Sequence, residues 1–379
     1  MRVPVVDRNH NPLMPTKPAR ARRWLKAGKA IKRWSDVGVF YVQLTVDPSD
    51  VELQPVTAGI DPGKKYSGIG VQSAKSTLFM AHLVLPFEPV KKRMETRAMM
   101  RRTRRSRRIN RSKPFELRNH RQKRFNNRHN KKVAPSIRAN RQLELRVFKE
   151  LQRIFPISKV YYEIVRADVD LTSGRKKAKS GKGFSPVMVG QKWLLSSLSK
   201  LCETITKQGW DTANLRRQLG LTKSQKKSDQ TPETHAVDGI SLACAEFIRY
   251  QKFHKRNENG ATWVGSVSIT YSVFSIIRRP PVSRRNLHKL QFSKGHVRNK
   301  YGGTTSSFTA IRKGDLVTGV KGSKRYYGYV SGFTGANQIS ISSTDWKRYG
   351  HFSPRKVTLL RRSTGLVVRP SLTSLVSAC

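Results

Sequence analysis

The sequence predicts an α/β protein with more than one domain, and three observations carry this prediction. Short apolar strands joined by tight turns come early in the chain, and segments with helical spacing of apolar residues follow them. The last third changes to short strands separated by turn residues. A chain of 379 residues is long enough for two or three domains, each with its own core.

The charge of the chain points to a polyanionic partner. It has 76 lysines and arginines against 23 aspartates and glutamates, which gives a formal net charge of +53. Such an excess would repel itself unless phosphates neutralised it, so we expect a nucleic acid or an anionic membrane as partner. No apolar run approaches the roughly 20 residues that a membrane span requires. We therefore expect nucleic acid and no membrane.

The cysteines and the first residues bear on the cellular compartment. Cys202, Cys244 and Cys379 lie far apart and show no CxxC spacing. This argues against a disulfide framework or a zinc ribbon and fits a reducing cytoplasm. Residues 1–15 lack the apolar region of a signal peptide. The expected location is the cytoplasm.

The first 48 residues are expected to form a small domain. A segment with two prolines, Pro12 and Pro15, comes first, and a basic helix should follow it within residues 17–30 and end at Gly28. Residues 39–46 alternate between apolar and polar side chains, which predicts a half-buried strand.

Three short strands are predicted next, at 57–61, 67–72 and 78–85. The first ends at Asp61, and the Pro62–Gly63 pair turns the chain directly after it. A meander with one carboxylate on its first strand is typical of the beginning of an RNase H-like sheet.

A fourth strand is predicted at 158–165. Beyond Lys159 it is apolar or aromatic except for Glu163, which places an acid in a strand suited to burial. Glu163 could instead face water from an edge strand. Asp168 and Asp170 follow closely and compete with it for a role in metal binding.

A histidine and an aspartate open a helix that we predict over 235–250. His235 and Asp238 are three residues apart and would share a face of that helix. They could be a plain surface pair. In so basic a chain, however, carboxylates are scarce, and Asp61, Glu163 and Asp238 together suggest one convergent site. Two Mg²⁺ ions held by carboxylates are the standard means of displacing a phosphodiester. These residues therefore indicate a metal-dependent nuclease.

The most basic part of the chain is 91–132, with 19 lysines and arginines in 42 residues against only Glu95 and Glu116. Its arginines would cover every side of a helix, which is stable only if phosphates surround it. The candidate nucleic-acid contacts are Arg101, Arg102, Arg104, Arg105, Arg107, Arg108 and Arg111. A disordered basic tail is the alternative. The internal position of the block and the apolar segments on both sides argue against a tail.

The remaining segments divide into loops, helices and a β-rich end. Residues 173–182 and 223–231 have loop composition, and 191–208 has helical spacing. A strand is predicted at 267–276. The strands expected after it are 313–317, 325–332, 338–343 and 356–361. This pattern suits a small SH3-like barrel, whose lysines, arginines and aromatic residues could contact nucleic acid or simply form a core with a solvated rim.

The order of these features resembles the IscB/IsrB group of transposon-encoded, RNA-guided nucleases over nearly the whole chain. The resemblance rests on Pro12-Leu13-Met14-Pro15, Gly59-Ile60-Asp61-Pro62-Gly63, the arginine-rich helix, the acid-bearing strand and His235-Ala236-Val237-Asp238. It implies that Asp61, Glu163 and Asp238 are the acids of a split RuvC domain and that His235 is catalytic beside them. The implied domains are 1–48 (PLMP), 49–90 (RuvC part I), 91–132 (bridge helix), 133–258 (RuvC parts II and III) and 259–379 (target-motif domain).

One departure from the group narrows the expectation. IscB proteins carry an HNH nuclease between the second and third RuvC segments, but residues 164–234 contain no histidine here. The resemblance is therefore to the HNH-lacking IsrB branch. It implies a monomer bound to a guide (omega) RNA that nicks the displaced strand of target DNA beside a short flanking motif, with two Mg²⁺ or Mn²⁺ ions. A non-catalytic RNA-binding protein and an unguided RuvC-like resolvase remain as alternatives.

Overall fold

The computed structural model forms two compact units, each described here by itself. The first comprises Met1–Pro86, Ile137–Arg278 and Val368–Cys379, and the second comprises Phe87–Ser136 and Arg279–Val367. The structure describes residues 1–48, 51–106, 110, 112–117, 133–165, 186–255, 258–281, 290–291, 297–298, 311–334, 338–371 and 373–375. Among the helices of these residues, none is long and apolar enough to cross a membrane.

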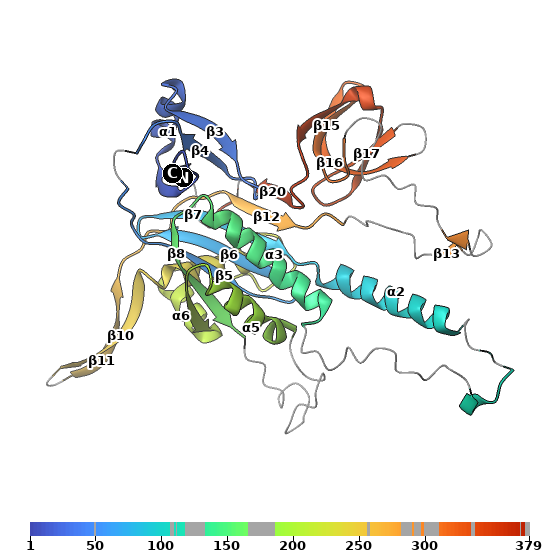
Figure 1. Cartoon of the computed structure of the whole chain (residues 1–379). Coiled ribbons are helices and arrows are strands. Elements are labelled where there is room, and N and C mark those ends of the chain that lie inside the picture. The colour runs from blue at the N-terminus through green and yellow to red at the C-terminus, as the bar shows by residue number, and fades with distance from the viewer. Residues whose placement is uncertain are drawn as a thin grey trace. The chain divides into compact units, whose positions relative to one another are not determined.

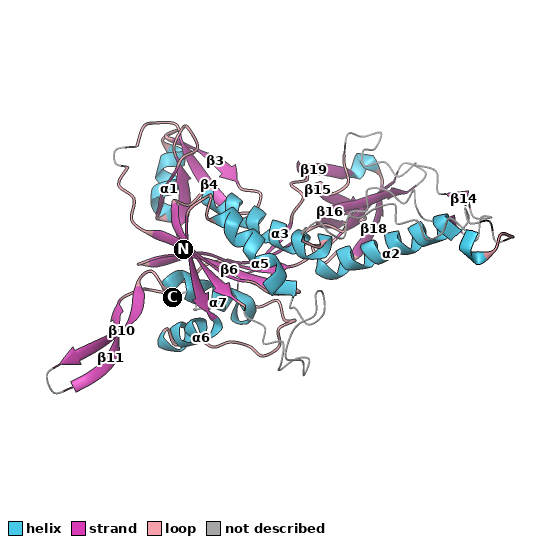
Figure 2. Cartoon of the chain, turned by 60° about the horizontal axis from the view of Figure 1, so that its bottom comes forward, coloured by secondary structure: helices cyan, strands magenta, loops and turns pink. Residues whose placement is uncertain are grey.

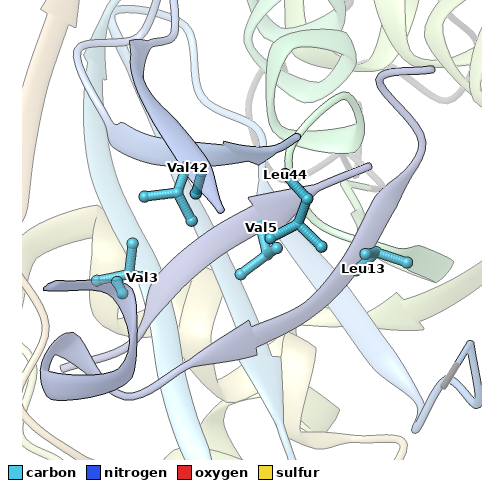
Figure 3. Packing of buried hydrophobic residues seen from close by; sticks show 7 residues of the cluster. Val3, Val5, Leu13, Val42 and Leu44 are labelled. Carbon is cyan, nitrogen blue, oxygen red and sulfur yellow. The ribbon is translucent and has the colours of Figure 1, made fainter. Parts of the chain in front are cut away.

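The chain begins with a four-stranded sheet in the order β2-β1-β4-β3. Its elements are β1 (Val3–Val6), β2 (Pro12–Thr16), α1 (Pro18–Lys26), β3 (Ala30–Trp34) and β4 (Phe40–Leu44). Val3, Val5, Leu13, Val42 and Leu44 pack together between these elements (Figure 3). The predicted strand at 39–46 and the helix ending near Gly28 are confirmed.

Pro12 and Pro15 both lie within β2. Strand β2 is at the edge of the sheet, and proline is tolerated there because the side of the strand that faces away from the sheet needs no N–H donor.

The centre of the first unit is a seven-stranded sheet in the order β20-β12-β7-β6-β5-β8-β9 (Figure 1). Its strands are β5 (Val56–Asp61), β6 (Tyr66–Ser73), β7 (Ser76–Val84), β8 (Ile157–Ile164), β9 (Glu203–Gln208), β12 (Phe274–Arg278) and β20 (Val367–Ser371). Strands β5, β6 and β7 form an antiparallel meander, and β8 and then β9 join in parallel on the β5 side. This order and direction are those of an RNase H-like sheet, as the sequence predicted.

Two helices cover opposite faces of this sheet. Alternation along the strands places Ser67 and Tyr162 on one face and Asp61 and Glu163 on the other. Helix α3 (Pro135–Gln152) lies on the first face (Figure 1). Its side chains form hydrogen bonds with Ser67 and Tyr162. Helix α7 (Val237–Cys244) lies on the second, against β5 and β6 (Figure 2). The carboxylates therefore share their face with α7.

Three boundaries differ from the sequence predictions. The helix predicted over 191–208 is instead α5 (Pro186–Leu198) followed by β9, since Thr204, Ile205 and Thr206 are β-branched and pair beside β8. Helix α7 ends at Cys244, well before the predicted end at residue 250. The chain then enters a hairpin of β10 (Ile248–Lys255) and β11 (Glu258–Gly265).

The strand predicted at 267–276 is present only as β12, which pairs in parallel with β7. Both β12 and β20 belong to the seven-stranded sheet, although the sequence placed them in a C-terminal domain beginning at residue 259. The boundary at 259 is therefore not where the main sheet ends.

The second unit contains a long basic helix and a five-stranded antiparallel sheet in the order β18-β17-β16-β15-β19. Its principal elements are α2 (Phe87–Ser106), β15 (Leu316–Lys321), β16 (Lys324–Thr334), β17 (Gln338–Ser342), β18 (Arg348–Phe352) and β19 (Val357–Arg361). The core of this five-stranded sheet is formed by buried apolar side chains, namely Ile311, Val317, Val330, Ile339, Ile341 and Phe352. The strands predicted at 325–332, 338–343 and 356–361 are confirmed, whereas β15 begins three residues after the predicted start at 313, and β18 was not predicted. The SH3-like closure remains a prediction.

Only part of the predicted nucleic-acid helix lies within the described residues. Arg101 and Arg102 are on α2, and both side chains are exposed. Arg104 and Arg105 also fall within α2, but the structure describes only their backbone and not their side chains. Arg107, Arg108 and Arg111 lie outside the described residues altogether.

Candidate active site at the ends of two parallel strands

Asp61 and Glu163 lie side by side at the ends of neighbouring strands. Strands β5 and β8 run in parallel, and Ile60 is paired with Tyr162 in their register. Each of these paired residues is followed directly by an acid, so the two carboxylates occur at one level of the sheet and on one face. Asp61 is buried, and Glu163 is partly exposed.

Helix α7 and the turn before it bring His235 and Asp238 to the same place. Pro232–Ala236 forms a single π-helical turn, and α7 begins at Val237. His235 Nδ1 donates a hydrogen bond to Asp61 Oδ2 at 2.9 Å. Asp238 lies in the first turn of α7 and is buried. The sequence predicted one regular helix for both residues. In the structure His235 belongs to the π-helical turn, and Asp238 belongs to α7.

A glycine makes this approach feasible. Gly68 of β6 is paired with Asp61, and a Cβ atom at this position would lie 1.7 Å from the His235 carbonyl oxygen. The turn that carries His235 therefore rests directly on the bare backbone of β6. Any larger residue would push His235 away from Asp61.

The three carboxylates interact electrostatically. Burial raises the pKa of Glu163 to about 7, and the negative charges of Asp61 and Asp238 act in the same direction. A hydrogen bond of 2.5 Å from Thr212 Oγ1 to Glu163 Oε2 opposes this rise. Burial also raises the pKa of Asp238, and the charge of Asp61 adds to it. The charge of Asp61 thus acts on both of the other carboxyl groups.

Two cations that sequence analysis missed partly balance these charges. Arg216 of α6 (Gly209–Gln218) donates to Asp238 Oδ1, and Lys223 donates to Asp238 Oδ2. The positive charge of Lys223 also lowers the pKa of Glu163. No sequence signal distinguishes these two residues, because lysine and arginine are common throughout the chain.

The donor set fits a hard divalent cation. Mg²⁺ prefers carboxylate oxygens, and a cation between these acids would relieve the repulsion that raises the pKa values of Glu163 and Asp238. Within the described part of the chain, however, no group of three or more His, Cys, Asp or Glu side chains is arranged to hold a metal ion. Asp238 is turned toward Arg216 and Lys223. Both carboxylate oxygens of Asp238 thus already accept a hydrogen bond from a cationic side chain.

A second histidine lies next to His235. His82 of β7 is fully buried, and its ring centroid is 5.5 Å from that of His235. Thr234 Oγ1 donates to Thr231 O, so it accepts the hydrogen bond of 3.1 Å that joins it to His82 Nδ1. Burial lowers the pKa of His82 to about 3, which keeps its ring neutral. Its polar position within the apolar run of β7 was the signal that sequence analysis overlooked.

Asp168 and Asp170, which the sequence offered as alternative metal ligands, lie outside the described residues. The structure therefore brings together Asp61, Glu163, His235 and Asp238 and adds Arg216, Lys223, Thr212 and His82 around them.

Comparisons with known proteins match parts of this chain. The sequence profile of the RRXRR protein family matches residues 3–183, which include Asp61 and Glu163. None of the curated proteins matches. Among solved structures, T. thermophilus RuvC in complex with Holliday junction substrate is 14% identical, with a TM-score of 0.26, over 50% of this chain and 90% of that chain. Over its first half, this chain is thus similar to the RRXRR proteins.

Proposed function

We propose that this protein is a metal-dependent, RuvC-like endonuclease that uses a guide RNA to nick DNA. The observation that carries the proposal is the convergence of Asp61, Glu163, His235 and Asp238 on one face of an RNase H-like sheet. These residues come from three distant segments in a chain of net charge +53, in which acids are scarce. The RRXRR family, which is found in IscB-type nucleases, supports the same assignment.

The three carboxylates would hold two Mg²⁺ ions, which supply an activated water and stabilise the leaving oxygen of a phosphodiester. The protein's own residues position the reacting groups. Because His235 Nδ1 donates to Asp61, its Nε2 is left to accept a proton from the attacking water. Lys223 and Arg216 both pair with Asp238. If a metal ion replaced them at Asp238, their positive charges would be free to contact the phosphate of the substrate.

The guide RNA and the choice of strand rest on the sequence. Arg101 and Arg102 are exposed on α2, within the most basic segment of the chain, and such a helix suits a phosphate backbone. Residues 164–234 contain no histidine, so they offer no second nuclease of the HNH type. A single site that accepts single strands would cut the displaced strand, since the guide-paired strand is held in a duplex.

The test is a cleavage assay on a duplex that matches the RNA copurified with the protein. Each strand is labelled separately, and the reaction is run with and without Mg²⁺. We expect one cut in the displaced strand, none in the guide-paired strand, and no cut by Asp61→Ala. Asp229→Ala removes an exposed acid outside the site and is expected to cut normally.

Three outcomes would contradict this proposal in different ways. Cutting of both strands by a monomer would reveal a second site. Cleavage of junctions without any RNA would favour an unguided resolvase. Binding of RNA and target without cleavage by the wild type would favour a non-catalytic RNA-binding protein.

A further inference from the structure

Helix α3 carries a buried ion pair on the face of the sheet opposite the candidate site. Arg141 Nη1 lies 3.0 Å from Glu144 Oε2, and the two side chains are 1% and 0% exposed. Burial raises the pKa of Glu144 to about 7, although Arg141 and Ser67 lower it and Asp61 raises it further. A buried ion pair often stabilises a fold no more than apolar residues of the same size would. Its presence therefore needs another explanation.

Arg141 contacts both segments that carry the acids of the β-sheet. Its Nη2 donates to Gly63 O at 2.6 Å, and its Nη1 donates to Tyr162 OH at 3.3 Å. Gly63 is two residues after Asp61, and Tyr162 directly precedes Glu163. One planar guanidinium group thus connects the turn after β5 to the end of β8.

Glu144 also binds the turn after β5, through Ser67. It accepts a hydrogen bond from Ser67 Oγ, which in turn accepts one from the Gly63 N–H at 3.0 Å. The N–H and the carbonyl of Gly63 are therefore both fixed by the ion pair. Asn140 Nδ2 donates to Lys64 O at 2.8 Å, one residue further along.

A glycine of helix α5, Gly190, leaves space for the side chain of Arg141. A Cβ atom at Gly190 would lie 2.9 Å from Arg141 Cγ. The guanidinium group is thus enclosed by α3, α5 and the sheet and has little freedom to take another position.

We propose that Arg141 and Glu144 are positioning residues that fix the separation of Asp61 and Glu163 and thereby set the metal affinity of the site. The inference rests on the proposed function, because it assumes that these two acids bind metal. Partners behind the ligands of a metal site commonly change its affinity by roughly 10- to 100-fold.

The test compares two Arg→Lys substitutions on the same helix. Arg141→Lys keeps the charge beside Glu144, but one ammonium group cannot replace the fork that reaches Gly63 and Tyr162. Arg146→Lys is the matched control, since the described partners of Arg146 are Glu150, at 3.1 Å on α3, and Asp36 rather than Gly63 or Tyr162. Mn²⁺ is titrated into each metal-free, full-length protein and followed by calorimetry and electron paramagnetic resonance.

We expect Mn²⁺ to bind Arg141→Lys roughly 10- to 100-fold more weakly than the wild type and Arg146→Lys within about twofold of it. Excess Mn²⁺ should restore the nicking rate of Arg141→Lys, which a general folding defect would not allow. If that variant fails to fold, Glu144→Gln takes its place, because a glutamine still accepts the Ser67 hydrogen bond but loses the ion pair.

Unchanged Mn²⁺ affinity in Arg141→Lys would overturn the inference and leave the proposed function intact. Equal weakening in both lysine variants would also overturn it, because the effect would then belong to the helix in general. Absence of Mn²⁺ binding by the wild type would overturn the proposed function, and the inference with it.

Discussion

Replacing Gly68 with alanine is expected to disable the site without unfolding the protein. The new Cβ atom would lie 1.7 Å from the His235 carbonyl oxygen and 2.3 Å from its carbonyl carbon. Normal contact requires at least about 3.2 Å, so the turn must retreat by roughly 1.5 Å. Forcing a methyl group into a packed interface costs about 1 to 3 kcal/mol, and a displacement of about 1 Å in a catalytic group can reduce a rate about 100-fold.

The assay is single-turnover nicking at saturating Mg²⁺, together with RNA binding and thermal melting. We expect Gly68→Ala to nick about 100-fold more slowly and to bind RNA as the wild type does. Gly332→Ala is the control, because a Cβ atom at Gly332 meets nothing within 4 Å. A Gly68→Ala protein whose nicking rate stays within about threefold of the wild type would show that the contact between the turn and β6 does not position His235.

Further predictions concern charge. Lys223→Met removes a cation from Asp238 and should raise the Mn²⁺ affinity of the metal-free protein, as measured by calorimetry; a lower affinity would contradict the view that Lys223 competes with metal. Because the folded pKa of Glu144 is raised from 4.5 to about 7, its contribution to the free energy of unfolding is greatest below pH 4.5 and falls as the pH rises to about 7. Glu144→Gln should flatten that slope in denaturant titrations of the metal-free protein, and an unchanged slope would refute the assignment. Substituting Arg101 and Arg102 with alanine should reduce the dependence of log K for RNA on log salt by about 1.4, since each lost phosphate contact accounts for about 0.7; an unchanged slope would place α2 outside the RNA interface.

The sequence was sufficient for β5, β6, β7 and β8 of the main sheet and for the two acids that these strands carry. The meander could be recognised because its apolar segments are short and bounded by turn residues, and the pairings of β5, β6 and β7 follow from that. Asp61 and Glu163 stood out because each interrupts or ends an apolar strand in a chain with few acids. Strand alternation then placed both on one face.

Other features depend on contacts that local patterns do not encode. The helical spacing of Trp193, Leu194, Leu198 and Leu201 continues to Ile205 by coincidence, while pairing with β8 decides that Ile205 belongs to a strand. Arg141 and Glu144 look like an ordinary surface pair three residues apart. Their burial depends on Gly63, which lies 78 residues before Arg141, and no spacing along the helix indicates that contact.

The path of the chain through the main sheet has a consequence for how the protein could be rebuilt. The second unit consists of two segments, Phe87–Ser136 and Arg279–Val367, and each leaves the first unit and returns to it. The longer segment leaves at β12 and returns at β20, which are neighbours in the sheet. Both segments are therefore insertions within one folded body. A short linker in place of residues 279–366 would leave every strand of the seven-stranded sheet in the chain. The longer segment could then be exchanged between relatives as a cassette, while the carboxylate site stays on an unaltered scaffold.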